Sequence, residues 1–295
     1  MVNSKYLNII WIVISLLLFV GCETEPIDYS KMVVEGWIDA GKHPIVMLHT
    51  SYSLDASNDP HDTQLIDVLA EHMVLFGKVI IFDGEDSVFL TGRVDTNYLP
   101  PYIYTTTKIK GEVEKTYTLH ATYKDYSATS KTEIPERAIL DSIQVTSAND
   151  KMNVVGFANH LEKGAPYILF ARTTKDKQYK ICPMGAFRAT KSQMSITINN
   201  PINFTENGMM LQTLFPKNDS INIAIKFAKV GEIEYQFWDS YIAQNMTQGV
   251  YFMETHRNII SNIDSGNGYW CGMGASEYII QLSKDSLYIF NNELE

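Results

Sequence analysis

Apolar and polar side chains alternate along much of this chain, a pattern typical of β-strands that bury one face. The clearest example is TYTLHATY at Thr116–Tyr123, where every second residue from Tyr117 is apolar or aromatic. Because turn-forming residues separate the runs, the sequence predicts these strands: Met32–Asp39, Ile45–Ser51, Lys78–Phe82, Tyr102–Thr107, Thr116–Tyr123, Tyr126–Ile134, Ser142–Thr146, Met152–Ala158, Tyr167–Thr174, Met194–Ile198, Ile221–Phe227, Tyr278–Leu282 and Leu287–Phe290.

Two stretches instead have a helical period. Asp62–Met73 is one, and the second is Glu232–Met246, where Ile233, Phe237 and Tyr241 are expected on one side. The fold class predicted is mainly β, with two β-sandwich domains of Ig-like or prealbumin-like type and a few short helices. The strand Tyr126–Ile134 is ended by Pro135 and the charged residues Glu136 and Arg137. We therefore place the domain boundary there, which gives domains at 31–135 and 136–295, the second with a helix near 232–246.

The N-terminus has the composition of a secretory signal. Lys5 precedes an apolar run from Leu7 to Val20, which is too short for a comfortable membrane span, and small Gly21 follows. In bacterial lipoproteins a cysteine at the next position receives a diacylglyceryl group, and cleavage before it leaves a lipidated N-terminus. We therefore predict a lipoprotein signal peptide at 1–21 and lipid attachment at Cys22; the alternative is an ordinary signal with a coincidental cysteine.

Residues 22–30 are polar and acidic, and we interpret them as a tether between lipid and fold. The whole chain carries a formal net charge of −10. This charge argues against nucleic acid as a partner and against electrostatic attachment to anionic lipid. Anchoring to the membrane is therefore assigned to Cys22 alone.

Two further cysteines, Cys182 and Cys271, follow in the body of the chain. Outside the cytoplasm they could form a disulfide, which would stabilise the fold by constraining the unfolded chain. The alternative is two unpaired, buried thiols that behave as small apolar side chains.

Motifs that would indicate catalysis or a cofactor are weak. Gly36 to Lys42 matches part of a phosphate-binding loop, but His43 stands where a hydroxyl residue is needed, so we interpret the segment as a hairpin turn. The sequence has no G-x-S-x-G or Ser-x-x-Lys nucleophile motif. Carboxylates and histidines gather between Asp55 and His72 without a metal-binding spacing. No catalytic residue, metal or cofactor is assigned.

The segment SGNGYWCGMG near the C-terminus combines four glycines with adjacent aromatic residues. Glycines there indicate unusual backbone geometry, and the aromatic rings offer flat contact surfaces. The candidate partner- or ligand-contacting loop consists of Asn262, Gly266, Gly268, Tyr269 and Trp270. The alternative is a structural loop whose aromatic residues cap the second sandwich.

Four pieces in order also resemble a known family: KMVVEGWID at Lys31–Asp39, VIIFDG at Val79–Gly84, the run Gly111–Pro135 with LDSI after it, and EIEYQFWDSYI leading to SNIDSGNGYW at Ser261–Trp270. The pattern resembles Bacteroidota outer-membrane lipoproteins of unknown function (DUF4249-type), often encoded beside SusC/SusD-like importers. Where that family has a Gly- and Phe-rich end, this chain has Tyr269, Trp270 and Cys271.

The resemblance implies two β domains, anchoring at the outer membrane, and association with a TonB-dependent SusC-like transporter and its SusD-like lipoprotein. It implies no catalytic residue. Glu23 and Glu25 resemble the signal that sends such lipoproteins to the cell exterior. We expect a non-enzymatic accessory protein for oligosaccharide or peptide uptake; the alternatives are a surface hydrolase acting before import and an adhesin-like structural module.

Overall fold

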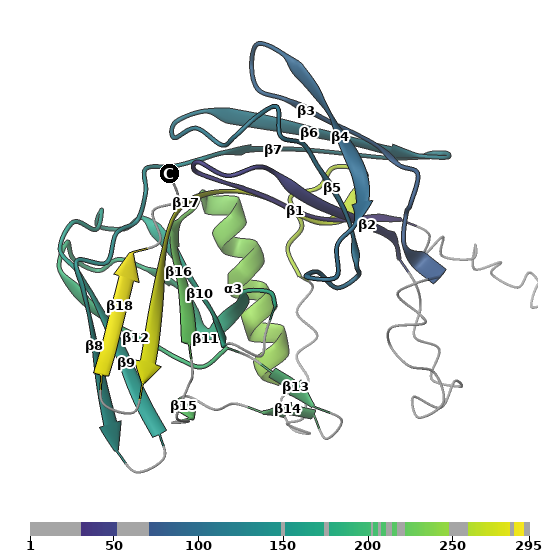
Figure 1. Cartoon of the computed structure of the whole chain (residues 1–295). Helices are drawn as coiled ribbons and strands as arrows, with labels where there is room; N and C mark the ends of the chain where they lie inside the picture. Colours follow the sequence, from purple (N-terminus) through teal and green to yellow (C-terminus); the bar gives the residue numbers. More distant parts are fainter. Residues whose placement is uncertain are drawn as a thin grey trace, which may run out of the picture. The chain divides into compact units, whose positions relative to one another are not determined.

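Strand β1 begins the part of the chain that the computed structural model describes, which comprises residues 31–51, 71–148, 151–173, 177–201, 203–205, 208–210, 214–216, 222–247, 259–283 and 286–291 (Figure 1). The strands of the first half are β1 (Met32–Asp39), β2 (Ile45–Thr50), β3 (Lys78–Phe82), β4 (Ser87–Val94), β5 (Tyr102–Thr105), β6 (Thr116–Tyr123) and β7 (Tyr126–Glu133).

The second half adds further strands and the helix α3 (Glu232–Thr247). Its strands are β8 (Ser142–Ala148), β9 (Lys151–Ala158), β10 (Pro166–Thr173), β11 (Lys180–Arg188), β12 (Met194–Ile198), β13 (Asn203–Thr205), β14 (Gly208–Met210), β15 (Phe215–Pro216), β16 (Asn222–Lys229), β17 (Gly266–Ser283) and β18 (Ser286–Asn291). The mainly β fold predicted from the sequence is confirmed.

One 12-stranded sheet has the order β11-β10-β16-β17-β1-β2-β5-β4-β3-β6-β7, and β18 pairs with β17. The long strand β17 joins the two halves of this sheet. Its first part, Gly266 to Met273, runs parallel to β1, and its second part, Gly274 to Gln281, runs antiparallel to β16. Residues widely separated in the sequence therefore become neighbours around β17.

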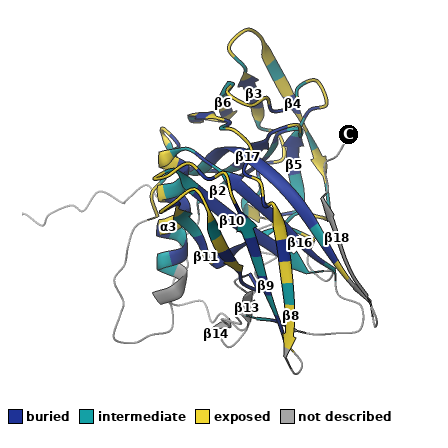
Figure 2. Ribbon diagram, turned by 90° about the vertical axis from the view of Figure 1, so that its left-hand side faces the viewer, coloured by how far each residue is buried: buried dark blue, intermediate teal, exposed yellow. Residues whose placement is uncertain are grey.

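Two apolar cores lie on one side of these central strands. The first core is formed mainly by residues 32–134 and includes Trp270 of β17. The second lies between β10, β16 and β17 and a four-stranded sheet of β8, β9, β12 and β15, with Phe227 and Val154 among its fully buried members. Figure 2 shows β17 dark blue along much of its length and β8 largely exposed.

A third apolar cluster lies on the opposite face of the large sheet, where α3 packs against β10, β11 and β17. The helix predicted near 232–246 is confirmed, and its buried face differs from the side that carries Ile233, Phe237 and Tyr241. Ile233 is 45 % exposed, whereas Trp238 and Ile242 are buried with Phe237. The sequence did not distinguish these faces because aromatic residues lie all round the helix.

Residues 31–295 form one compact unit. The chain passes from the first core to the second between Ile134 and Ala138, close to the predicted boundary at 135/136. The first part of β17, however, completes the sheet of the first region. Independent folding of 31–135 and 136–295 stays a prediction, and Gly266 to Met273 belong with the first region in space.

Most predicted strands are confirmed to within two residues, and Met32–Asp39, Lys78–Phe82, Thr116–Tyr123 and Met194–Ile198 match at both ends. Strands β4, β11, β13, β14 and β15 and the first part of β17 were not predicted. The other helical prediction, Asp62–Met73, lies mostly outside the described residues, although Glu71 and His72 are helical.

Candidate functional site

The glycine- and aromatic-rich segment is the first part of β17, and the prediction of a loop there is corrected. Its glycines allow β17 to pass very close to neighbouring backbone. A Cβ atom at Gly268, which has a φ of 103°, would lie 1.9 Å from the carbonyl oxygen of Val34. A side chain at this position is excluded because both the space and the left-handed backbone conformation require glycine.

The other candidate residues, Asn262, Tyr269 and Trp270, make contacts within the fold. Trp270 is fully buried, and its indole N–H donates a 3.0 Å hydrogen bond to the carbonyl oxygen of Tyr117. The Asn262 side chain accepts from the Trp270 N–H at 2.9 Å and donates to the Trp270 carbonyl at 2.7 Å. Tyr269 packs against Phe237 of α3, with ring centroids 4.6 Å apart. Trp270 therefore contributes no ligand surface.

Of the two alternatives for Cys182 and Cys271, the structure has the unpaired, buried thiols and not the disulfide. Both thiols are free and fully buried, Cys182 in the second core and Cys271 in the cluster under α3. The Cys182 thiol donates to the carbonyl oxygen of Asn199 at 3.1 Å. Burial raises the pKa of both thiols, so neither is an activated nucleophile.

The predicted lipid-attachment residue, Cys22, lies outside the described residues, as do the tether 22–30 and most of the segment Asp55 to His72. Within the described ranges, no group of three His, Cys, Asp or Glu side chains is arranged to hold a metal ion. No helix in the same ranges has the length and apolar character needed to cross a membrane.

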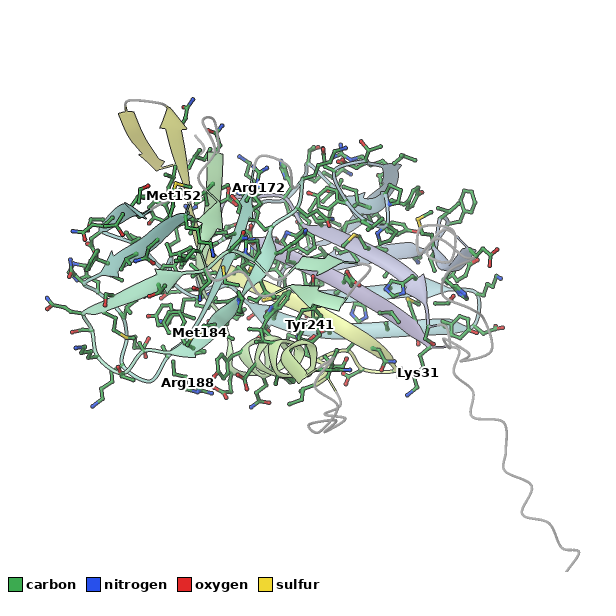
Figure 3. All side chains as sticks on the ribbon, turned by 90° about the horizontal axis from the view of Figure 1, so that it is seen from below. Lys31, Met152, Arg172, Met184, Arg188 and Tyr241 are labelled. Carbon is green, nitrogen blue, oxygen red and sulfur yellow. The ribbon has the colours of Figure 1, made fainter. Side chains whose placement is uncertain are left out.

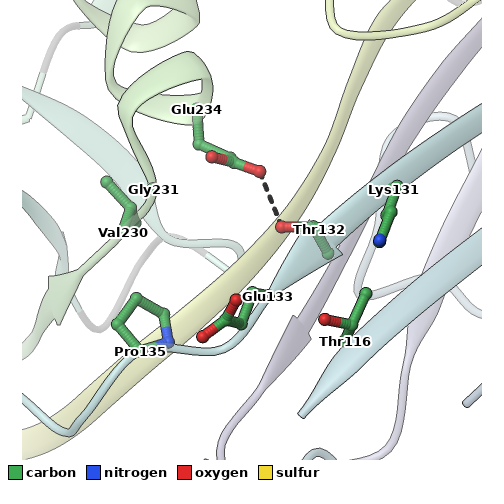
Figure 4. Close-up of a pocket in the computed structure, with 8 residues that line it drawn as sticks. All are labelled: Thr116, Lys131, Thr132, Glu133, Pro135, Val230, Gly231 and Glu234. Atoms are coloured by element: carbon green, nitrogen blue, oxygen red, sulfur yellow. Dashed lines mark hydrogen bonds between the residues drawn. The ribbon is translucent and has the colours of Figure 1, made fainter. Parts of the chain in front are cut away.

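A pocket of about 460 Å³ opens where β7 meets the start of α3 (Figure 4). Its wall includes Thr116, Lys131, Thr132, Glu133, Pro135, Val230, Gly231 and Glu234. Lys131 and Glu133 are exposed, whereas Thr132 and Glu234 are buried. The pocket is therefore a polar opening with a buried carboxyl group on one wall.

Glu234 lies in the first turn of α3, and its carboxylate accepts a 2.6 Å hydrogen bond from the Thr132 hydroxyl. That hydroxyl in turn accepts from the backbone N–H of Gly272 at 2.8 Å. Burial raises the pKa of the Glu234 carboxyl, while hydrogen bonds from Thr132 and from its own backbone N–H act in the opposite direction. These contacts tie α3 to β7 and β17, so the carboxyl group caps the helix as well as facing the pocket.

Sequence reasoning missed a cluster of charges on the face of the sheet that also contacts α3. We call Asp39, Lys42, Arg172, Lys226 and Glu277 the charged cluster. The Lys226 ammonium lies 2.6 Å and 2.8 Å from the two carboxylate oxygens of Asp39, and both side chains are almost completely buried. Lys42 pairs with Glu277 at 2.5 Å, and Glu277 lies directly across from Lys226 in the sheet.

Beside this cluster, Tyr179, which precedes β11, lies next to Arg172 of β10. The Arg172 guanidinium lies 5.1 Å from the centre of the Tyr179 ring. The Tyr179 hydroxyl makes hydrogen bonds with Arg172 and Glu277, and burial together with the charge of Glu277 raises the pKa of Tyr179. One sign of this arrangement is visible in the sequence, where Lys226 lies within the apolar run Ile223 to Phe227.

Comparison with known proteins identifies the family. The model of the domain of unknown function DUF4249 matches residues 21–278, which is most of the chain. No curated protein matches the chain. The protein therefore belongs to the family described as domain of unknown function (DUF4249).

Proposed function

We propose that this protein is a lipid-anchored lipoprotein of the outer membrane, exposed at the cell surface, and a non-enzymatic accessory subunit of a TonB-dependent SusCD-like nutrient importer. The observation that carries the proposal is Cys22, directly after a short apolar signal and before an acidic tether. Membership of the DUF4249 family is in line with the sequence resemblance on which the proposed SusC- and SusD-like partners rest.

The chemistry of the described residues is compatible with capture rather than turnover. The buried thiols have raised pKa values. The Glu234 carboxyl is engaged by Thr132 and by the start of its own helix. A surface hydrolase would need a second group to act with Glu234; Glu133 lines the same pocket but is exposed, and no hydrogen bond joins it to Glu234 in the described residues. Non-enzymatic binding of an oligosaccharide or peptide is therefore the proposal we favour.

The test is purification of the native membrane complex through a tag at the C-terminus of this chain. We expect a SusC-like transporter and a SusD-like lipoprotein to copurify from the outer membrane. A Cys22→Ser variant should lose both membrane attachment and the copurifying proteins. Recovery of the tagged protein from membranes with neither partner would contradict the importer role.

The hydrolase alternative is tested separately with Glu234→Gln. Glycan and peptide panels incubated with the purified protein should show no product above a blank. Turnover by the wild-type protein that is abolished by Glu234→Gln would favour the hydrolase instead.

A further inference from the structure

Arg172 differs from the other cations of the charged cluster, because no ion pair joins it to a carboxylate of the described residues. Lys226 pairs with Asp39, and Lys42 pairs with Glu277. Within the part of the chain that the structure describes, no carboxylate oxygen lies within 4.0 Å of the Arg172 guanidinium. The charged cluster therefore has three cations and two anions, an excess of positive charge in a chain with a net charge of −10.

Aromatic rings lie beside these charges. The Trp37 and Tyr98 rings have centroids 6.0 Å apart and are tilted by 43°. The charges of Asp39 and Glu277 contribute to a raised pKa of Tyr98, after burial and Asp95, so this ring lies near the cluster. Trp37, Tyr98 and Tyr179 are all only partly buried. The charged cluster thus lies beside three partly buried aromatic rings, and its Arg172 guanidinium lies over one of them, that of Tyr179.

Two segments from different halves of the chain meet beside the cluster. The Lys177 ammonium donates a 3.0 Å hydrogen bond to the carbonyl oxygen of Thr96. This contact connects the segment that carries Tyr98 to the segment that carries Tyr179. Figure 3 shows Arg172 near the middle of the molecule, between the N-terminal strands and the C-terminal sheets.

The backbone N–H and C=O groups of the strands that carry the charged cluster form hydrogen bonds within the sheet. Strand β16 pairs with β10 on one side and β17 on the other, and β17 pairs with β1 beyond it. A peptide cannot add a strand between these strands, because the described residues of β16 pair with both neighbouring strands and those of β17 pair with β1. Recognition here must come from side chains, which suits a ligand that carries charge and hydroxyl groups on a rigid ring.

We propose that Arg172, together with Trp37, Tyr98 and Tyr179, binds an acidic saccharide through its carboxylate. The guanidinium provides a planar fork for the two carboxylate oxygens. The sugar ring lies against the aromatic faces, whose negative charge attracts its C–H groups. The claim that this saccharide is captured for import rests on the proposed function.

The test is calorimetric titration of the purified full chain in detergent with trigalacturonate, beside its methyl ester and the neutral maltotriose. We expect the acid to bind and the ester to bind about tenfold more weakly or worse, because a charge-assisted hydrogen bond is lost. Raising the salt concentration should weaken binding of the acid and leave the neutral sugars unchanged.

Arg172→Gln should weaken binding of trigalacturonate by about tenfold or more. The matched control is Arg188→Gln, because Arg188 also lies over a tyrosine ring, that of Tyr235 at 4.5 Å, but its charge is opposed by Glu232 of α3. This control should leave the dissociation constant unchanged. Tyr98→Ala offers a second variant outside the sheet, with an expected loss of about fivefold.

Three results would overturn the inference. These are equal affinity for acid and ester, no binding of trigalacturonate to the wild-type protein, and equal losses in Arg172→Gln and Arg188→Gln. Binding of short peptides through a free C-terminal carboxylate, without binding of the saccharide, would assign the cluster to peptides and also contradict the proposal. Because binding is measured on the isolated protein, a failed copurification with the importer would leave this result standing.

Discussion

The two faces of the central strands β1, β16 and β17 are both covered, yet they are built from different side chains. One face presents Phe227 and Trp270 to the apolar cores. The other carries Asp39, Lys226 and Glu277, each less than 10 % exposed. Polar residues in an alternating strand therefore do not always mark the side that faces water.

The apolar and the charged face also contribute differently to the free energy of unfolding. Apolar burial stabilises the fold directly, whereas a buried ion pair must offset the cost of removing two charges from water. Apolar residues of similar volume could often replace such a pair without loss of stability. Stability alone therefore does not account for the charged face, which is in line with the proposed site at Arg172.

The largest expected effect concerns the apolar face. Trp270→Ala should lower the free energy of unfolding by about 3–5 kcal/mol, because it empties a fully buried site and removes a hydrogen bond to Tyr117. Urea denaturation measures this change. The matched control is Phe89→Ala in β4, 59 % exposed, which should cost less than about 1 kcal/mol. Equal losses in the two variants would contradict the assignment of Trp270 to the core.

The charged face should respond differently to single and double changes. Lys226→Met should cost about 3 kcal/mol, because it leaves Asp39 buried without its partner. Adding Asp39→Leu should restore much of this stability, since neither charge then remains. Denaturation of the two single variants and the double variant gives the coupling energy. Additive losses would show that the pair is not coupled.

A smaller, pH-dependent effect is expected at Glu234. Its pKa is raised above the ordinary 4.5 by burial, so the folded protein binds this proton more tightly than the unfolded chain. The destabilisation by the carboxylate is absent below pH 4.5, appears as the pH rises, and is complete above the folded-state pKa. Relative to Glu234→Gln, the wild-type protein should lose stability as the pH rises from 4.5 through the raised folded-state pKa of Glu234. A difference that is constant with pH would contradict this expectation.

The smallest effect is expected for a charge near the surface. Hydrogen bonding with the backbone of Asp86 and with Lys115 lowers the pKa of Asp83 from 3.8 to about 2. Its contribution to stability is therefore present above pH 3.8 and is lost as the pH falls through about 2. Asp83→Asn should cost under about 1 kcal/mol at neutral pH, far less than Lys226→Met. A cost equal to that of Lys226→Met would remove the contrast between exposed and buried pairs.

Alternation predicted the strands well wherever one face is buried and the other is wet. β6 and β12 match at both ends for this reason. β11 was missed because Pro183 and Gly185 interrupt its pattern, and its pairing with β10 contains a register shift. The first part of β17 was missed because its glycines, which allow close backbone approach, also resemble those of a loop.

The charged cluster could not be predicted from one sequence. Its members come from β1, β10, β16 and β17 and from the turn after β1, and only the register of the sheet brings them together. The position of Lys226 within an apolar run was the single feature of the sequence that indicated this cluster. The pocket at Glu234 likewise depends on contact between β7 and α3, which are separated by about a hundred residues.

These sites serve nutrient capture at a membrane only if the chain is lipidated, so the most direct measurement is mass spectrometry of the N-terminal peptide of the mature protein. The account predicts a peptide that begins at Cys22 and carries diacylglyceryl and acyl groups on that residue. A mature N-terminus elsewhere, or an unmodified Cys22 thiol, would contradict it.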